Sequence, residues 1–126
     1  MKIVVLILRI LLGLGFTVFG ILGFVMQPDP STLPPLVQAM AESGYMIVMV
    51  KIVELLCGLL ILSGRWVPLA LVLLGPVMVN IVLFHLFLAP ADGLVGYVFF
   101  LIWLFLGWAY RGSYSGMLAA NAQPTV

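Results

Sequence analysis

Four long apolar runs alternate with short polar segments along the chain. The runs predict helices at about residues 3–26, 45–62, 66–88 and 94–111. Each run approaches the roughly 20 residues that a helix needs to cross a hydrocarbon core of about 30 Å. Only helices satisfy their own backbone hydrogen bonds in lipid at these lengths. The pattern predicts an all-α, membrane-embedded four-helix bundle, with residues 1–126 as a single transmembrane domain.

The charged residues between the runs sort into two groups. Basic residues flank one set of helix ends: Lys2, Arg65 and Arg111. Acidic residues flank the other set: Asp29, Glu42 and Asp92. Because positively charged loops stay on the cytoplasmic side during insertion, we expect both termini to be cytoplasmic. The protein is then a multi-pass protein of a bacterial-type cytoplasmic (inner) membrane.

The connection between the first two runs is longer than the others and contains four prolines that break helix: Pro28, Pro30, Pro34 and Pro35. Apolar residues then recur at helical spacing: Leu33, Leu36, Val37 and Met40. This pattern predicts a short amphipathic helix at about residues 33–43, ended by Gly44. Such a helix either lies on the outer membrane surface or folds over the mouth of the bundle as a lid.

The composition narrows the class of function. Hydrophobic residues make up 65% of the chain and charged residues 7%, so lipid must cover much of the surface. A net charge of +1 argues against nucleic acid as a partner. Cys57 is the one cysteine, which excludes a CxxC redox pair. His, Cys and carboxylate residues show no metal-ligand spacing, so we expect no metal, no catalytic residue and no certain cofactor.

Small residues follow one face of the first run. Arg9, Gly13, Thr17 and Gly20 are spaced by four, four and three residues. Small residues let a neighbouring helix approach closely, so we expect this face, with Arg9, to point into the bundle. The alternative is that Arg9 extends to the cytoplasmic head groups.

Lys51, Glu54 and Gly58 share one face of the second run. A charge near the middle of the bilayer costs about 2.5–3.5 kcal/mol on insertion scales. Glu54 is therefore expected to contact Lys51 or Arg9 within about 4 Å. The pair is either purely structural, or part of a polar site in which Glu54 binds a ligand or carries a proton.

In the third run, Pro76 should kink the helix. Asn80 follows one turn later, and an amide in lipid needs partners, so we expect it to face the bundle. His85 lies near the outer boundary, about 140° around a straight helix from Asn80. It either transfers protons or hydrogen-bonds the outer loop.

Three segments resemble the DoxX-like (DoxX/DoxD) family of small four-span membrane proteins. They are Arg9-Ile-Leu-Leu-Gly-Leu-Gly-Phe with Phe19-Gly20, the run from Glu54 to Arg65, and Val67-Pro68 with Gly75-Pro76 and Val79-Asn80-Ile-Val-Leu-Phe-His85. The resemblance covers nearly the whole chain and implies a compact four-helix membrane bundle. Relatives of the DoxD type are associated with thiosulfate:quinone oxidoreduction, and others with oxidative-stress assemblies.

These observations favour a bundle that binds a small hydrophobic or amphipathic molecule, a quinone or a lipid. The expected ligand-binding residues are Arg9, Lys51, Glu54, Asn80 and His85. We expect a pocket toward the outer side, lined by Lys51, Glu54 and Asn80 and capped by Leu36 or Met40.

Two alternatives stay open. The chain is either a quinone-site membrane subunit of an oxidoreductase complex, with electrons from a redox partner protein, or a ligand-free assembly scaffold. A homo-oligomer is compatible with each of these functions. The sequence contains no cofactor or catalytic motif, so it does not decide whether the chain is an enzyme.

Overall fold

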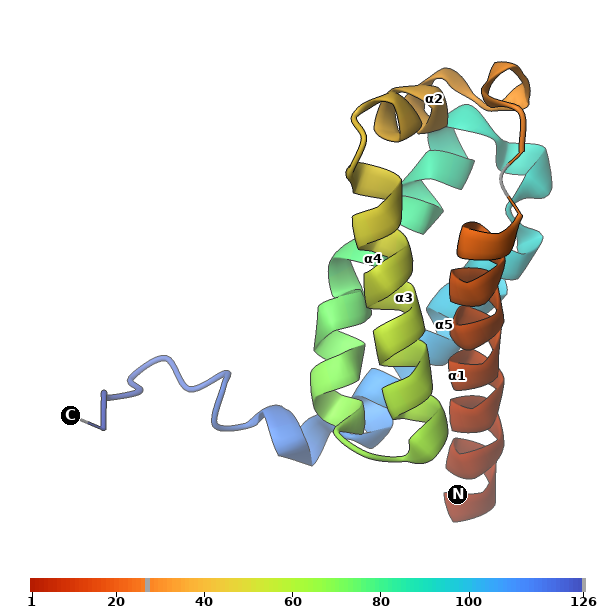
Figure 1. Cartoon of the computed structure of the whole chain (residues 1–126). Coiled ribbons are helices and arrows are strands. Elements are labelled where there is room, and N and C mark those ends of the chain that lie inside the picture. Colours follow the sequence, from red (N-terminus) through yellow and green to blue (C-terminus); the bar gives the residue numbers. More distant parts are fainter. Residues whose placement is uncertain (27, 126) are drawn as a thin grey trace.

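The computed structural model describes residues 1–26 and 28–125, with the side chains of Pro30 and Asp92 excepted. This part is helical, without strands (Figure 1). Its α-helices are α1 (Lys2–Val25), α2 (Pro35–Glu42), α3 (Met46–Ser63), α4 (Val67–Leu88) and α5 (Leu94–Ala109). Short 3₁₀ turns are η1 (Pro30–Thr32), η2 (Pro90–Asp92) and η3 (Arg111–Tyr114).

Four apolar helices form the bundle, and α2 lies across one end of it (Figure 1). We call this the α2 end; the opposite end, which holds the N-terminus and the turn between α3 and α4, is the turn end. The helices α1, α3 and α4 are long and apolar enough to cross a membrane, and α5 is a shorter apolar helix of 16 residues. At about 1.5 Å per residue, α5 is about 24 Å long.

The ends of these helices lie within two residues of the ends expected from the apolar runs. The predicted amphipathic helix is present as α2, and Gly44 follows it with a φ of +85°. Gly64 ends α3 with a φ of +80°, while the amide of Arg65 donates to the carbonyl of Leu60 at 3.2 Å. This left-handed glycine cap makes the turn into α4 tight enough for a helical hairpin.

The closest helix contact joins α1 to α3, and glycines make it possible. A Cβ added at Gly13 would stand 2.6 Å from the backbone nitrogen of Leu62, and one at Gly20 2.9 Å from the Cα of Leu55. The hydroxyl of Thr17 donates to the carbonyl of Gly13 at 2.7 Å, so it remains satisfied within α1. The predicted small-residue face of α1 therefore packs directly on the backbone of α3.

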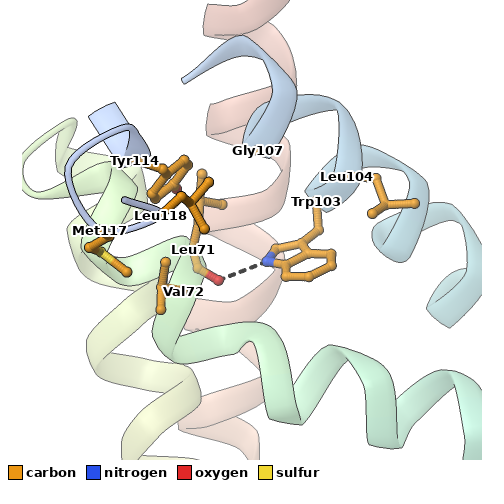
Figure 2. A pocket seen from close by; sticks show the side chains of 8 residues that line it. All are labelled: Leu71, Val72, Trp103, Leu104, Gly107, Tyr114, Met117 and Leu118. Atoms are coloured by element: carbon orange, nitrogen blue, oxygen red, sulfur yellow. Dashed lines mark hydrogen bonds between the residues drawn. The ribbon is translucent and has the colours of Figure 1, made fainter. Parts of the chain in front are cut away.

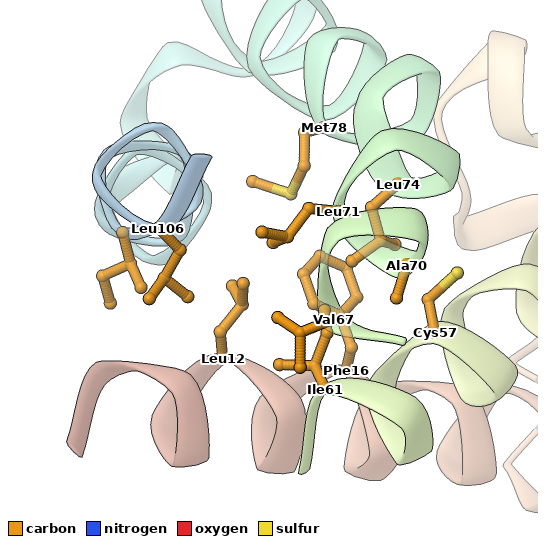
Figure 3. Close-up of a cluster of buried hydrophobic side chains, with 11 residues drawn as sticks. Leu12, Phe16, Cys57, Ile61, Val67, Ala70, Leu71, Leu74, Met78 and Leu106 are labelled. Carbon is orange, nitrogen blue, oxygen red and sulfur yellow. The ribbon is translucent and has the colours of Figure 1, made fainter. Parts of the chain in front are cut away.

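The buried apolar core lies in the half of the bundle nearer the turn end. Figure 3 shows its side chains meeting between α1, α3, α4 and α5. On α4, the buried positions run from Val67 to Met78, and on α3 Cys57 and Ile61 complete the cluster. Beyond Met78, no residue of α4 belongs to the core, so the half of the bundle near the α2 end is less tightly filled.

The helix α4 changes direction near its middle, as its green-to-teal ribbon shows in Figures 1 and 2. Pro76 lies inside the helix at this point. Proline has no N–H to donate to the carbonyl four residues earlier, and its ring crowds that carbonyl, so a helix bends there. The kink predicted from the sequence is thus confirmed.

The orientation of the bundle in the membrane is a prediction that labelling can test. In a variant without Cys57, cysteines at Ser31 and Ser115 would lie near opposite ends of the bundle, and both positions are exposed. A membrane-impermeant maleimide should label position 31 in intact cells, and position 115 only after lysis. Labelling of both positions from outside would contradict the model of two cytoplasmic termini.

Candidate functional site

A cavity of about 310 Å³ lies between α1, α3, α4 and α5, toward the α2 end. Its lining combines three polar side chains with an apolar wall. The lining residues are Phe16, Phe19, Lys51, Glu54, Met78, Ile81, His85, Val95, Gly96 and Phe99. The cavity begins where the buried core of α4 ends, because Met78 belongs to both.

The predicted contact of Glu54 with a basic residue is confirmed for Lys51. The Nζ of Lys51 lies 3.1 Å from the Oε2 of Glu54, and the two side chains are 27% and 7% exposed. The residues are one turn apart on α3, so each offsets part of the cost of holding the other's charge at this depth. The ammonium group keeps two further N–H donors for other acceptors.

Gly23 on α1 gives Lys51 its position. A Cβ added at Gly23 would stand 2.6 Å from the Cγ and 2.7 Å from the Cε of Lys51. The aliphatic part of the lysine therefore crosses the surface of α1 where a side chain is missing. Gly23 lies three residues after Gly20 and continues the small-residue face of α1, and here it makes room for one side chain of the cavity.

Arg9 does not line the cavity. Its guanidinium packs against Gly64 in the turn between α3 and α4, at the turn end. Gly64 is ten residues beyond Glu54, which corresponds to about 15 Å along a helix. The alternative pairing of Arg9 with Glu54 is not formed, and the structure does not bring Arg9 to the cavity.

The expectation that Asn80 faces the bundle is wrong. Asn80 is exposed, and its Nδ2 donates to the carbonyl of Pro76 at 2.8 Å on its own helix. The buried side of α4 carries Leu74 and Met78. Asn80 is two residues beyond Met78, about 200° around the helix, so it points away from the core. It does not line the cavity.

His85 does line the cavity, beside the start of α5. Its Nδ1 lies 2.8 Å from the carbonyl oxygen of Ile81. A carbonyl can only accept, so Nδ1 carries the proton and Nε2 is left as an acceptor in the neutral ring. Tyr97 contacts the imidazole edge-on with 6.3 Å between ring centroids. The partner of His85 is thus its own helix, and the alternative bond to the outer loop is not seen among described residues.

Three phenylalanines form an aromatic wall that the sequence analysis missed. The ring of Phe99 on α5 lies 5.8 Å from that of Phe16 and 5.9 Å from that of Phe19, between centroids. Phe99 also packs against Gly15, where the absence of a side chain admits the ring. The signal in the sequence was the pairing of Phe16 with Phe19 at helical spacing next to that glycine.

The predicted cap is not formed. Leu36 and Met40 belong to α2, which lies across the end of the bundle, but neither lines the cavity. In this conformation α2 leaves the cavity without a lid from its own residues. Met40 is half-buried, whereas Leu36 is exposed.

A second cavity of about 370 Å³, at the turn end, is lined by apolar and aromatic residues of α4, α5 and the C-terminal segment (Figure 2). The indole N–H of Trp103 donates to the carbonyl of Leu71 at 2.9 Å. The hydroxyl of Tyr114 donates to the backbone carbonyl of Pro68, also at 2.9 Å. Burial, with a smaller effect of Tyr110, raises the pKa of Tyr114, which therefore stays protonated as a donor. This cavity offers a ligand no charged group.

The sequence matches one family model, described as DoxX, over residues 4–86. The match contains the polar residues of the first cavity, Lys51, Glu54 and His85, and it ends before α5. No curated protein and no solved structure matches the chain.

Proposed function

We propose a ligand-binding function for this chain, which belongs to the DoxX family and is a multi-pass membrane protein. Its ligand is a small amphipathic molecule that enters the cavity near the α2 end. The observation that supports this proposal is the combination, in one cavity, of the Lys51–Glu54 pair with an aromatic wall. A polar group in such a cavity orients a ligand, and the apolar wall supplies the contact area.

The chemistry of the cavity favours a quinone head group over a phospholipid. The Lys51 ammonium has N–H donors left for a ring carbonyl of a quinone, and the Nε2 of His85 can accept from a ring hydroxyl of the reduced quinol. Glu54 cancels the charge of Lys51, so the cavity is suited to a neutral ligand more than to a phosphate. Phe16, Phe19 and Phe99 present rings against which a flat molecule can pack.

The volume of the cavity sets a limit on the bound part. About 310 Å³ is at the small end of the range for ligand sites, roughly 300–1,000 Å³. It accommodates a ring with its substituents, whereas a long isoprenoid or acyl tail has to leave the bundle. The exposed apolar surface of the surrounding helices is where such a tail would lie, among membrane lipids.

Binding of a short-chain quinone to the purified protein in nanodiscs tests the proposal. A Lys51→Met, Glu54→Gln double variant removes both charges together, so no lone charge is left in the bundle. We expect its affinity for decylubiquinone to fall at least about tenfold, because a hydrogen bond from a charged donor is worth about 1.5–3 kcal/mol.

The matched control is Arg65→Met, which removes a basic residue at the turn end and should leave affinity unchanged. Equal affinity of the wild type and the double variant would contradict the proposal. Mass spectrometry of the purified wild type separates the two ligand classes, since a retained phospholipid in place of quinone would assign the cavity to lipid.

A further inference from the structure

Asn80 lies on the side of α4 that faces away from the bundle, among apolar residues. The exposed residues there follow helical spacing and form what we call the outward stripe: Leu73, Pro76, Asn80, Leu83 and Phe87. An exposed apolar stripe is ordinary for a helix in lipid. An exposed amide in its middle is not, because lipid tails offer no hydrogen bonds.

The amide of Asn80 has unused hydrogen-bonding capacity. One N–H of its Nδ2 donates to the carbonyl of Pro76 at 2.8 Å. The second N–H and the Oδ1 acceptor have no partner among the described residues. An amide left without hydrogen bonds in an apolar medium costs about 1–3 kcal/mol by measurements on protein variants.

Asn80 lies in the interior of α4, far from both ends of the helix. Asn80 is eight residues from the end of α4 at Leu88 and thirteen from its start at Val67. These separations correspond to about 12 Å and 20 Å along the helix. The asparagine side chain is too short to reach either interface, unlike lysine or arginine.

Pro76 removes one backbone donor from α4, one turn before Asn80. Because proline carries no N–H, the carbonyl of Val72 loses its usual partner in the helix. Val72 is itself exposed, and it lies one turn from Pro76. Asn80 thus follows the bend at Pro76 by one turn, on the same side of α4.

We propose that the outward stripe is an interface with a second copy of this chain, with Asn80 at its centre. Two copies of a membrane protein share one orientation, so their two-fold axis runs along the membrane normal. A residue beside this axis meets its own counterpart at the same depth. An amide both donates and accepts, so Asn80 can hydrogen-bond to Asn80 of the second copy, in a way that a charged group cannot.

The test measures dimers of the whole chain in liposomes of decreasing protein density, by single-molecule counting of fluorophores. The wild type should dimerise. Asn80→Leu should weaken the dimer by roughly tenfold, within the range measured for polar contacts between membrane helices. Asn80→Gln keeps the amide and should retain most of the affinity, which separates hydrogen bonding from a change in packing.

Cross-linking locates the interface. In a variant without Cys57, a cysteine at Leu83 on the outward stripe should form a disulfide-linked dimer on mild oxidation. A cysteine at Leu101, which is exposed on α5, should not. A wild type that stays monomeric at every density, as expected if lipid or a different protein covers the stripe, would overturn the proposal, as would equal cross-linking at both positions.

Discussion

Replacing Gly58 with alanine should force α1 and α3 apart and destabilise the bundle by about 2–3 kcal/mol, as overpacking does in cores. A Cβ at this position would stand 2.6 Å from the backbone nitrogen of Thr17 and 3.0 Å from the carbonyl carbon of Phe16. Backbone atoms cannot rotate away as a side chain can, so the whole helix has to move. Unfolding by SDS titration, followed by circular dichroism, measures the loss.

Gly107 provides the matched control for this prediction. It lies within α5, and a Cβ added there would meet no atom within 4 Å. Alanine is a better helix former than glycine by about 1 kcal/mol, so Gly107→Ala should be neutral or slightly stabilising. If both alanine variants lost stability equally, helix contact at Gly58 would not be the cause.

The contact between α1 and α3 was predictable because it depends on residue size. Gly13, Thr17 and Gly20 share one helix face, and only a close neighbour explains such a face. The helix ends were predictable for a similar reason. Prolines, glycines and charges interrupt the apolar runs at a few positions, and lipid admits few other structures between them.

The orientation of α4 was not predictable from its sequence. This helix carries apolar side chains on every face, because both the protein core and the lipid accommodate them. The sequence therefore contains no pattern that tells the inner face from the outer one. Asn80 was assigned to the bundle on the general cost of a polar group in lipid, and packing of Leu74 and Met78 placed it on the opposite side.

The cavity was predictable in part. Pro76 and the Lys51–Glu54 pair indicated a polar space in the half of the bundle near the α2 end. Its aromatic wall was not expected, since Phe99 reaches Phe16 only through the way α5 packs across α1. The contact of Arg9 was not predictable either. Helical spacing places Arg9 on one face of α1, but it does not decide which part of α3 the side chain contacts.

Glu54→Gln should destabilise the bundle by about 2 kcal/mol. In the wild type the carboxylate of Glu54 lies 3.1 Å from the ammonium of Lys51, and the variant leaves this ammonium without a charged partner. This estimate is below the cost of a lone lysine at the bilayer centre, since Lys51 is 27% exposed and can extend toward the α2 end. Unfolding of the protein in bicelles by steric trapping measures the difference.

The Lys51→Met, Glu54→Leu double variant should regain most of this stability, since no charge then remains unpaired. A double variant as unstable as Glu54→Gln alone would show that the pair stabilises the fold beyond mutual neutralisation. A double variant that is stable but no longer binds quinone would show that the pair is needed for binding and not for the fold. Apolar residues would then serve the fold equally well, and the two charges at this depth would be explained by the ligand that they hold.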